Sequence, residues 1–378
     1  MSGNNIDVAV IGGGVAGLAA AISFQRHGLT VLLLERDSEF GGRIKGEVIN
    51  KSADIFKKLF HQATFPSKFT QIVYKSAKYY TPSTKKHALR VFPQGKKIGI
   101  EYRELIHELV SIAIAEGVRL KLNSEVLQFI QRDARIVGLR YKEFDHIYEE
   151  FPRIIISAVG FHTSLERPPP LKSPKNVCPT VKIIAQDLNI PDPHILEFFL
   201  LEIPGVIWIF PKPHNRAEIG VTLWQDHDRY DLRAILDHAA HDHPFLKARL
   251  SRGAQIYHKS ELVVFGGPSR VNFAPNLFII GDAMGHVGAV GGSGIISSMT
   301  VGYDLGEFLG TRLKTVGELQ MNDFVAAQDL INKSAIGKWL KKEQSSAKAM
   351  REILYKPLKS PDEIDVLWDK FKGFIESR

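Results

Sequence analysis

The sequence predicts an α/β protein of two interleaved structural units, with helices closing its carboxyl end. Two glycine-rich segments, at Gly12 and at Gly281, each follow an apolar strand and predict the first unit. Several apolar, strand-like segments lie between them and predict a second unit built on an antiparallel sheet. The length of 378 residues also favours more than one core.

Composition is that of a folded protein, with 44% hydrophobic and 24% charged residues. The single cysteine, Cys178, allows no internal disulfide and no cysteine-based metal cluster, so we expect a reducing, cytoplasmic setting. The net charge of +8 suits nucleic acid, an anionic membrane or a phosphorylated substrate and selects none of them. No nucleic-acid or zinc motif is present, and "HAAHDHP" (238–244) is expected to be a solvated helix end. We therefore expect neither a nucleic-acid partner nor a metal.

The first glycine-rich segment predicts a dinucleotide-binding strand, turn and helix. Gly12, Gly14 and Gly17 fit the pattern G-x-G-x-x-G between the strands "DVAVIG" and "TVLLLE". Gly12 permits the turn, Gly14 lets the backbone approach a pyrophosphate, and Gly17 lets the helix pack on the sheet. Ala16, in the same segment, is included in this site. Glu35 ends the second strand, where a carboxylate binds ribose hydroxyls.

The second glycine-rich segment favours FAD over NAD. Asp282 ends a buried strand and can reach a polyol such as the ribityl chain of FAD. Gly291, Gly292 and Gly294 would let a helix N-terminus approach the flavin ring, where its partial positive charge favours the anionic reduced form. A simple NAD enzyme does not need this distant second site. We therefore predict bound FAD.

With these motifs the chain resembles flavoproteins of the glutathione-reductase-like, hydroxylase-type fold. Within that fold it is similar to the geranylgeranyl reductase family, which includes archaeal enzymes that saturate prenyl chains of membrane lipids. The likeness lies in "LLLERDSEFGGRIKGE", "IEYRELIHELVSIAIAEGVRL", "PGVIWIFPK" and "GDAMGHVGAVGGSGI". It implies an FAD-binding Rossmann domain, an inserted antiparallel-sheet substrate domain and C-terminal helices.

The expected boundaries make both domains discontinuous. The FAD-binding domain is expected to comprise 1–50, 99–170 and 255–311, and the substrate domain 51–98 and 171–254. Residues 312–378 are expected to form the C-terminal helical region.

The resemblance also implies roles for individual residues. Arg36 and Arg43 would lie near the FAD, and Arg103 would approach its phosphates or ribityl chain. Glu47 would lie in the loop beside the flavin. A solvated helix end is the other interpretation of Arg103.

The sequence departs from the family pattern at three places, and two of them, the missing cysteine and the missing proline, lie where the chemistry is expected. Lys45 stands where the family has a cysteine, Val159 stands where it has an aspartate, and "HVGAVGG" lacks the usual proline. We expect Lys45 either to hold a lipid phosphate or, with a lowered pKa, to donate a proton. Glu47 and His286 complete the set of candidate catalytic residues, although a loop histidine such as His286 is often structural.

In the segment Gly205–His214, Val206 to Phe210 is apolar throughout, whereas a strand with one exposed face alternates apolar and polar residues. The pattern does not show what the second face of this strand contacts. Trp208 and Phe210 share one face by period-two alternation, and we expect them to line an apolar tunnel over the flavin. An ordinary buried sheet is the alternative. Lys212, just beyond, could meet a lipid phosphate or lie in a solvated turn.

The C-terminal segment "GKWLKKEQSSAKAMREILYKPLK" (337–359) mixes lysines with apolar residues. This pattern suits a helix on an anionic membrane surface, or equally a helix packed on the protein body. A peripheral position on the inner membrane face is therefore an alternative to a purely cytoplasmic one.

The leading function is reduction of isolated carbon–carbon double bonds in a prenyl lipid or prenyl diphosphate. Reduced FAD would supply hydride, an unidentified acid would supply the proton, and ferredoxin or NAD(P)H would supply electrons. Alternatives are an FAD-dependent monooxygenase of the aromatic hydroxylase or halogenase type and a flavin desaturase or amine oxidase. A non-catalytic, flavin-binding lipid carrier is the alternative from another class.

Overall fold

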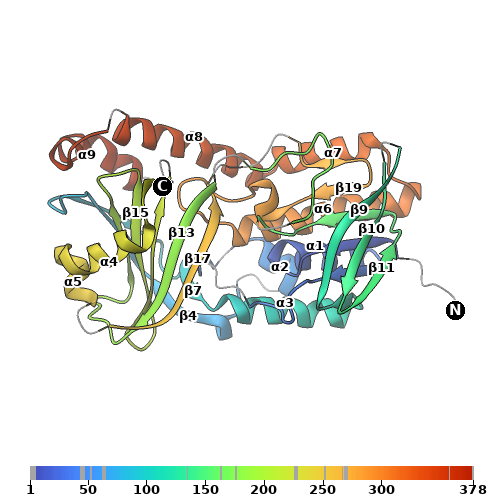
Figure 1. Ribbon diagram of the computed structural model, residues 1–378, viewed down its shortest axis with the longest axis horizontal. Helices are drawn as coiled ribbons and strands as arrows, with labels where there is room; N and C mark the ends of the chain where they lie inside the picture. The colour runs from blue at the N-terminus through green and yellow to red at the C-terminus, as the bar shows by residue number, and fades with distance from the viewer. Residues whose placement is uncertain are drawn as a thin grey trace.

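The computed structural model describes residues 6–42, 47–51, 53–61, 65–133, 135–161, 164–174, 177–224, 229–250, 253–265, 267, 271–356 and 358–376. The described chain forms two bodies side by side, each built on a large sheet (Figure 1). A long C-terminal helix extends from one body to the other (Figure 1).

The first body contains a six-stranded sheet with the order β18-β19-β12-β1-β2-β8. Its strands are β1 (Val8–Ile11), β2 (Val31–Leu34), β8 (Arg119–Lys121), β12 (Ile154–Ser157), β18 (Phe273–Ala274) and β19 (Leu277–Ile279). All neighbouring pairs are parallel except β18 and β19. The strands β1, β2 and β12 are buried along their whole length, as expected of a parallel sheet covered on both faces.

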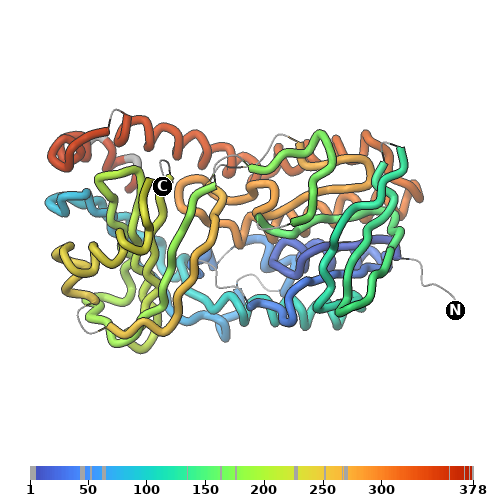
Figure 2. Tube along the Cα trace, in the orientation of Figure 1, coloured from blue at the N-terminus to red at the C-terminus, as the bar shows by residue number. Residues whose placement is uncertain are grey.

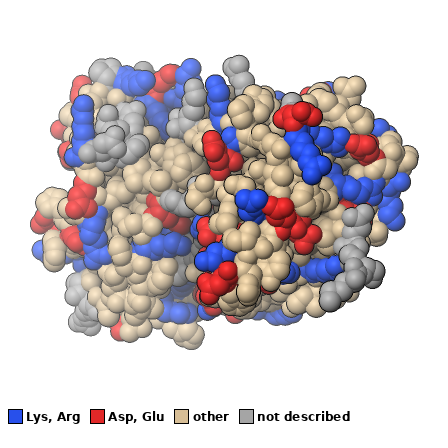
Figure 3. All heavy atoms as spheres, turned by 45° about the vertical axis from the view of Figure 1, so that its right-hand side comes forward, with Lys and Arg blue, Asp and Glu red and all other residues tan. Residues whose placement is uncertain are grey.

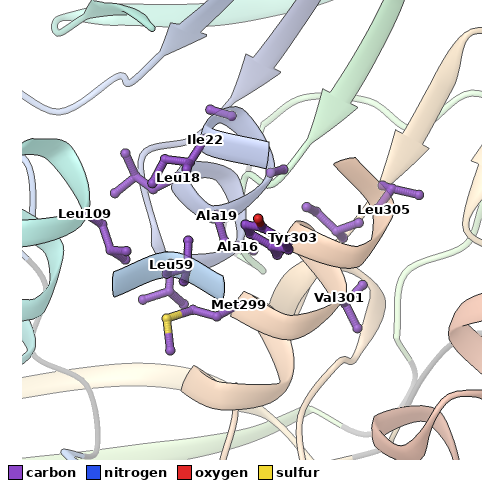
Figure 4. Packing of buried hydrophobic residues seen from close by; sticks show 14 of the residues in the cluster. Ala16, Leu18, Ala19, Ile22, Leu59, Leu109, Met299, Val301, Tyr303 and Leu305 are labelled. Carbon is purple, nitrogen blue, oxygen red and sulfur yellow. The ribbon is translucent and has the colours of Figure 1, made fainter. Parts of the chain in front are cut away.

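Helices cover one face of this sheet and share one apolar core. They are α1 (Val15–Arg26), α2 (Ile55–Phe60), α3 (Tyr102–Glu116) and α6 (Ile295–Val316). Leu18 of α1, Leu59 of α2 and Leu109 of α3 meet in this core beside Met299 of α6 (Figure 4). The helices α1 and α6 approach closely because α6 carries glycine at Gly302, where a Cβ atom would overlap the backbone of α1.

Smaller sheets complete the first body. A three-stranded antiparallel sheet of β9 (Ser124–Arg132), β10 (Arg135–Glu143) and β11 (His146–Glu150) covers the other face of the parallel sheet. A second three-stranded sheet contains β3 (Val48–Asn50), β7 (Lys97–Ile100) and β4 (Thr70–Tyr74). The short 3-10 helices η1 (Ser67–Phe69) and η3 (Gly281–Met284) lie in connections.

The second body is built on a seven-stranded sheet with the order β17-β13-β16-β15-β14-β5-β6. Its strands are β5 (Ser76–Tyr80), β6 (His87–Val91), β13 (Val177–Gln186), β14 (Ile195–Leu200), β15 (Gly205–Lys212), β16 (Arg216–Leu223) and β17 (Ala254–Val264). All pairs are antiparallel except β14 and β5. The helices α4 (Leu232–Asp242) and α5 (Pro244–Leu250) pack on one face, over Ile207, Ile209 and Ile219.

The segments that differ from the boundaries expected from sequence include β17, α2 and β4, of which β4 was expected in the substrate domain and pairs with β7 instead. The strand β17 is part of the seven-stranded sheet, although it was expected in the FAD-binding domain. The helix α2, expected in the substrate domain, buries Phe56 and Leu59 in the core beneath the parallel sheet. For β17 and α2 the physical reason is the neighbouring element. The strand β17 forms its hydrogen bonds with β13, and α2 packs over α1 and α6.

The C-terminal helices are α7 (Met321–Lys333), α8 (Ala335–Tyr355) and α9 (Pro361–Glu376). The helix α8 extends from the first body to the second along the top of the trace (Figure 2). Leu340, Met350 and Leu354 of α8 are buried, whereas Ile353 is exposed. The apolar residues of this helix therefore serve mainly the protein interior, as in the packed-helix alternative.

No described helix has the length and apolar character needed to cross a membrane. The face in Figure 3 carries lysine and arginine interspersed with aspartate and glutamate. On that face the excess positive charge is not gathered into one continuous patch.

Candidate active site

One continuous cavity of about 520 Å³ is lined by both bodies. The glycine-rich turns and the N-termini of α1 and α6 line it from the first body. The seven-stranded sheet lines it with the face opposite α4 and α5, which we call the cavity face. The two predicted sites, for cofactor and for substrate, therefore open into the same space.

The first glycine motif has the geometry that its pattern predicts. Gly12 has φ of +101°, and a Cβ atom there would lie 2.5 Å from the carbonyl oxygen of Ala158. A Cβ atom at Gly17 would overlap the carbonyl oxygen of Gly12, so neither position accepts a side chain. The helix α1 begins after Gly14 without a side-chain cap, and Gly14 and Ala16 line the cavity.

Glu35, at the end of β2, is hydrogen-bonded to the glycine-rich turn that precedes α1. Its carboxylate accepts a hydrogen bond of 2.6 Å from the backbone N–H of Gly13 and one of 3.0 Å from that of Asp37. Glu35 and Arg36 both line the cavity. A carboxylate has about four acceptor sites, so Glu35 keeps capacity for a ribose hydroxyl.

The second glycine motif lines the same cavity as the first. Asp282, Gly291, Gly292 and Gly294 all line the cavity, and α6 begins after Gly294 without a side-chain cap. The amide groups of two helix N-termini thus remain available to anionic groups in one cavity. This arrangement fits a dinucleotide with a pyrophosphate at one helix and a flavin ring that becomes anionic at the other.

The cavity face carries the predicted aromatic side chains. Val206, Trp208 and Phe210 line the cavity, while Ile207 and Ile209 point to α4 and α5. Additional aromatic and aliphatic residues extend this lining, namely Tyr79, Phe198, Leu200, Trp224, Phe265, Met350, Phe371 and Ile375. The two faces of β15 therefore serve two different purposes, which explains its unbroken apolar sequence.

The cavity face also carries polar side chains, which the expectation of an apolar tunnel did not include. Glu218 of β16 and Lys182 of β13 are buried and line the cavity, together with Thr180 and Thr222, whose hydroxyls lie 3.1 Å apart. Lys182 forms an ion pair with Glu261 of β17. Period-two spacing could have located these residues, because Glu218, Gly220, Thr222 and Trp224 alternate with apolar residues.

Known proteins share both the sequence and the fold. The model of the FAD dependent oxidoreductase family matches residues 7–158. The digeranylgeranylglycerophospholipid reductase of Picrophilus torridus is 30% identical over 312 residues, which cover 79% of this chain and 76% of that protein. The chain belongs to the geranylgeranyl reductase family. It is an FAD-dependent oxidoreductase.

Solved structures agree on the fold. A geranylgeranyl bacteriochlorophyll reductase-like protein from Thermoplasma acidophilum has a TM-score of 0.84 at 22% identity, covering 97% of this chain and 91% of that chain. A flavin-dependent brominase has a TM-score of 0.70 at 16% identity, covering 98% of this chain and 100% of that chain. Reductases and halogenases therefore share this architecture.

Arg103 of this family member does not line the cavity. Its guanidinium forms an ion pair with Glu39, and about half of the Arg103 side chain is exposed. The neighbouring Tyr102 lines the cavity instead. The ion pair with Glu39 holds Arg103 at the edge of the site, because the first turn of α3 points Tyr102 inward, and the contact of Arg103 with the cofactor stays a prediction.

Glu47 and Lys212 are also placed differently from the prediction. The buried Lys212 ammonium forms ion pairs with Glu47 and Glu101, and Glu47 accepts a hydrogen bond of 2.8 Å from the backbone N–H of Tyr102. Burial raises the pKa of Glu47 to about 7, against the opposing effect of Lys212. Neither residue lines the main cavity, so Lys212 is not a phosphate ligand in this structure.

His286 has a structural position. It is fully buried, and its Nδ1 accepts a hydrogen bond of 3.1 Å from the backbone N–H of Gly281. Its Nε2 lies 3.1 Å from the side-chain amide of Asn272. Burial lowers the pKa of His286 to about 4, so the ring is neutral. His286 does not line the cavity, so its contacts support a structural role and not that of a catalytic acid.

Two predicted residues, Arg43 and Lys45, lie outside the described residues.

The C-terminal helices contribute residues that the sequence did not indicate. Trp339 and Glu343 of α8 line the cavity, and Glu343 accepts a hydrogen bond of 3.2 Å from the backbone N–H of Val290 in the flavin-side loop. Only the packing of α8 on that loop reveals this contribution.

The part of the chain that the structure describes contains no group of three or more histidine, cysteine, aspartate or glutamate side chains arranged to hold a metal.

Proposed function

We propose that the protein reduces isolated carbon–carbon double bonds of a prenyl lipid of the geranylgeranyl type. The observation that carries this proposal is the single cavity bounded by the glycine motifs and by the aromatic cavity face. The printed name of the relative from Picrophilus torridus, a digeranylgeranylglycerophospholipid reductase, supports the same substrate class.

The residues that would hold FAD are those of the two motifs. Gly12 to Ala16 and the N-terminus of α1 would take the pyrophosphate, and Glu35 with Arg36 would take the adenosine end. Asp282 would bind the ribityl chain, and Gly291 to Gly294 would approach the flavin ring. When bound and reduced, the flavin supplies hydride to carbon.

The cavity face would bind and orient the prenyl chain. Burial contributes ~0.8 kcal/mol per methylene, so a chain of about twenty carbons gains more than ~10 kcal/mol before entropy is counted. Trp208, Phe210 and Phe198 would supply this apolar contact and exclude water from the reacting carbons. An unactivated alkene also requires a proton, which must come from an acid in the same dry space.

The remaining parts of the proposal concern partners. We propose ferredoxin or NAD(P)H as the electron donor. We propose that a lipid substrate is taken from a membrane surface, and that Lys45 contacts its phosphate.

Anaerobic reoxidation tests the function. The flavin is reduced chemically without oxygen and then mixed with geranylgeranyl phospholipid, geranylgeranyl diphosphate or an aromatic substrate. Flavin reoxidation by the prenyl compounds, with saturated product found by mass spectrometry, is the expected result. Reoxidation only by oxygen together with the aromatic compound would instead support a monooxygenase, and reduction of oxidised flavin by the added compound would support a desaturase or amine oxidase. A flavin that reacts with none of them would support a lipid carrier.

A further inference from the structure

Glu218 is the buried carboxyl group nearest in register to the aromatic side chains of the cavity face. It lies directly opposite Phe210 across the β15–β16 pair, so both side chains project to the same side of the sheet. Only 1% of its surface is exposed. Its Oε1 accepts a hydrogen bond of 2.9 Å from the indole Nε1 of Trp208.

The second carboxyl oxygen of Glu218, Oε2, differs from the first in its hydrogen bonding. Oε2 of Glu218 is buried and has no hydrogen-bond partner among the described residues. An ionised carboxylate oxygen left in this state is costly, whereas a protonated oxygen carries a donor available to a ligand or a water molecule. The geometry therefore favours the neutral acid with its proton on Oε2.

The charged neighbours of Glu218 come from each adjoining strand. Lys182 of β13 pairs with Glu261 of β17, and Lys212 of β15 pairs with Glu47 and Glu101. Tyr74 of β4 faces the same region, with its hydroxyl donating to the carbonyl of Pro211. Burial raises the pKa of Glu218 more than the two ammonium groups lower it, because both of those groups have carboxylate partners of their own.

We propose that Glu218 is the acid that protonates the substrate double bond, a role that rests on the proposed function. The O–H bond of the carboxyl group breaks and a C–H bond forms at one alkene carbon, at the expense of the π electron pair. A bound, reduced flavin would supply hydride, with its electron pair, for the second C–H bond. The alkene is thus reduced by two electrons, the flavin is oxidised by two electrons, and Glu218 is left as the carboxylate.

The same residue has a route by which its proton is restored. A second cavity of about 10 Å³ is lined by Glu218, Lys212, Glu47 and Tyr74, and this volume suits about one water molecule. Lys212 Nζ lies 3.3 Å from Glu101, whose side chain is 35% exposed. We call Glu101, Lys212, Glu47 and this small cavity the proton path, because Glu101 is partly exposed and the other members lie between it and Glu218.

The test uses the full chain with FAD bound and compares Glu218→Gln with Glu218→Asp. In an anaerobic single turnover, E218Q should slow prenyl-dependent flavin reoxidation by about a hundredfold or more, the usual contribution of a general acid. E218D keeps an acid and should recover part of the rate. Flavin content and the rate of chemical reduction of the flavin should match the wild type in both variants.

A matched control lies on the opposite face of the same sheet. Glu197 is also buried, and its carboxylate pairs with Arg249 beneath α5. E197Q should lower the thermal midpoint and leave the reoxidation rate near that of the wild type. An equal loss of rate in E197Q and E218Q would overturn the acid role, since the effect would then follow sheet stability.

Infrared spectroscopy gives a readout that does not need turnover. The difference spectrum between wild type and E218Q should contain the carbonyl band of a protonated carboxylic acid at neutral pH, with a shift in heavy water. A spectrum with only carboxylate bands contradicts the neutral acid and with it the proposal.

The proton path has its own test. E47Q should slow repeated turnovers more than the first one, because Glu218 is already protonated at the start. Equal slowing of both would overturn the path but not the acid role. A wild-type enzyme that no prenyl compound reoxidises overturns the proposed function itself, whereas normal wild-type reoxidation with an unaffected E218Q overturns the acid role alone.

Discussion

The indole ring of Trp208 lies across Gly220 of the neighbouring strand, at a distance where any Cβ atom on residue 220 would overlap the ring. The close approach also places Nε1 of the indole on Glu218. A glycine in the middle of a strand usually weakens the strand, so its presence here has a specific reason. Gly220 sets how deeply the indole ring of Trp208 reaches into the cavity and how the ring is tilted.

Gly220→Ala should therefore displace Trp208 and reduce turnover of long prenyl chains more than that of short ones. Overpacking of this kind costs about 1–3 kcal/mol of stability. Steady-state rates with prenyl chains of graded length, together with denaturant unfolding, measure both effects. The control is Gly373→Ala, where an added Cβ atom meets open space. An unchanged chain-length profile in G220A would contradict this role of the glycine.

Glu35→Ala should weaken FAD binding by about 1.5–3 kcal/mol, the range of lost charge-assisted hydrogen bonds. The loss has two sources, because Glu35 also holds the backbone N–H of Gly13 in the phosphate-binding turn. Fluorescence titration of the apoprotein with FAD measures it. E35Q keeps a hydrogen-bond acceptor and should lose less. Binding of NAD without FAD would refute the cofactor assignment.

Glu47 predicts a pH dependence of stability. Its folded-state pKa of about 7 lies above the ordinary value of 4.5, so the folded state binds a proton that the unfolded state has released. This contribution is complete below pH 4.5 and is lost as the pH rises through 7. E47Q, which is neutral throughout, should lose less stability than the wild type across that window. Denaturant unfolding at a series of pH values is the measurement, and parallel profiles would exclude the effect.

His286→Ala should destabilise the protein by about 1–3 kcal/mol for each buried polar group that loses its partner. Those groups are the backbone N–H of Gly281 and the side-chain amide of Asn272. Thermal unfolding should show the loss, and the flavin content should fall with it. If the folded variant instead keeps its stability and loses only a proton-dependent step in turnover, His286 is an acid after all.

The sequence alone determined the features that depend on local backbone geometry and strand periodicity. Gly12 and Gly17 could be recognised because the turn and the strand–helix contact exclude a Cβ atom at those positions. The shared face of Trp208 and Phe210 followed from the alternation of side chains along a strand, although their use as a cavity lining required the second body.

Only the tertiary structure decided the partners of the charged residues. Lys212 is adjacent in space to Glu47 and Glu101, which lie more than a hundred residues earlier in the chain, and this pairing turns an expected phosphate ligand into part of a buried ion cluster. Glu218 and Lys182 face the cavity because β16 and β13 pair across the sheet, and His286 is neutral because the fold surrounds it. A side chain's charge and hydrogen bonds depend on burial and on residues distant in sequence, and a local pattern contains neither.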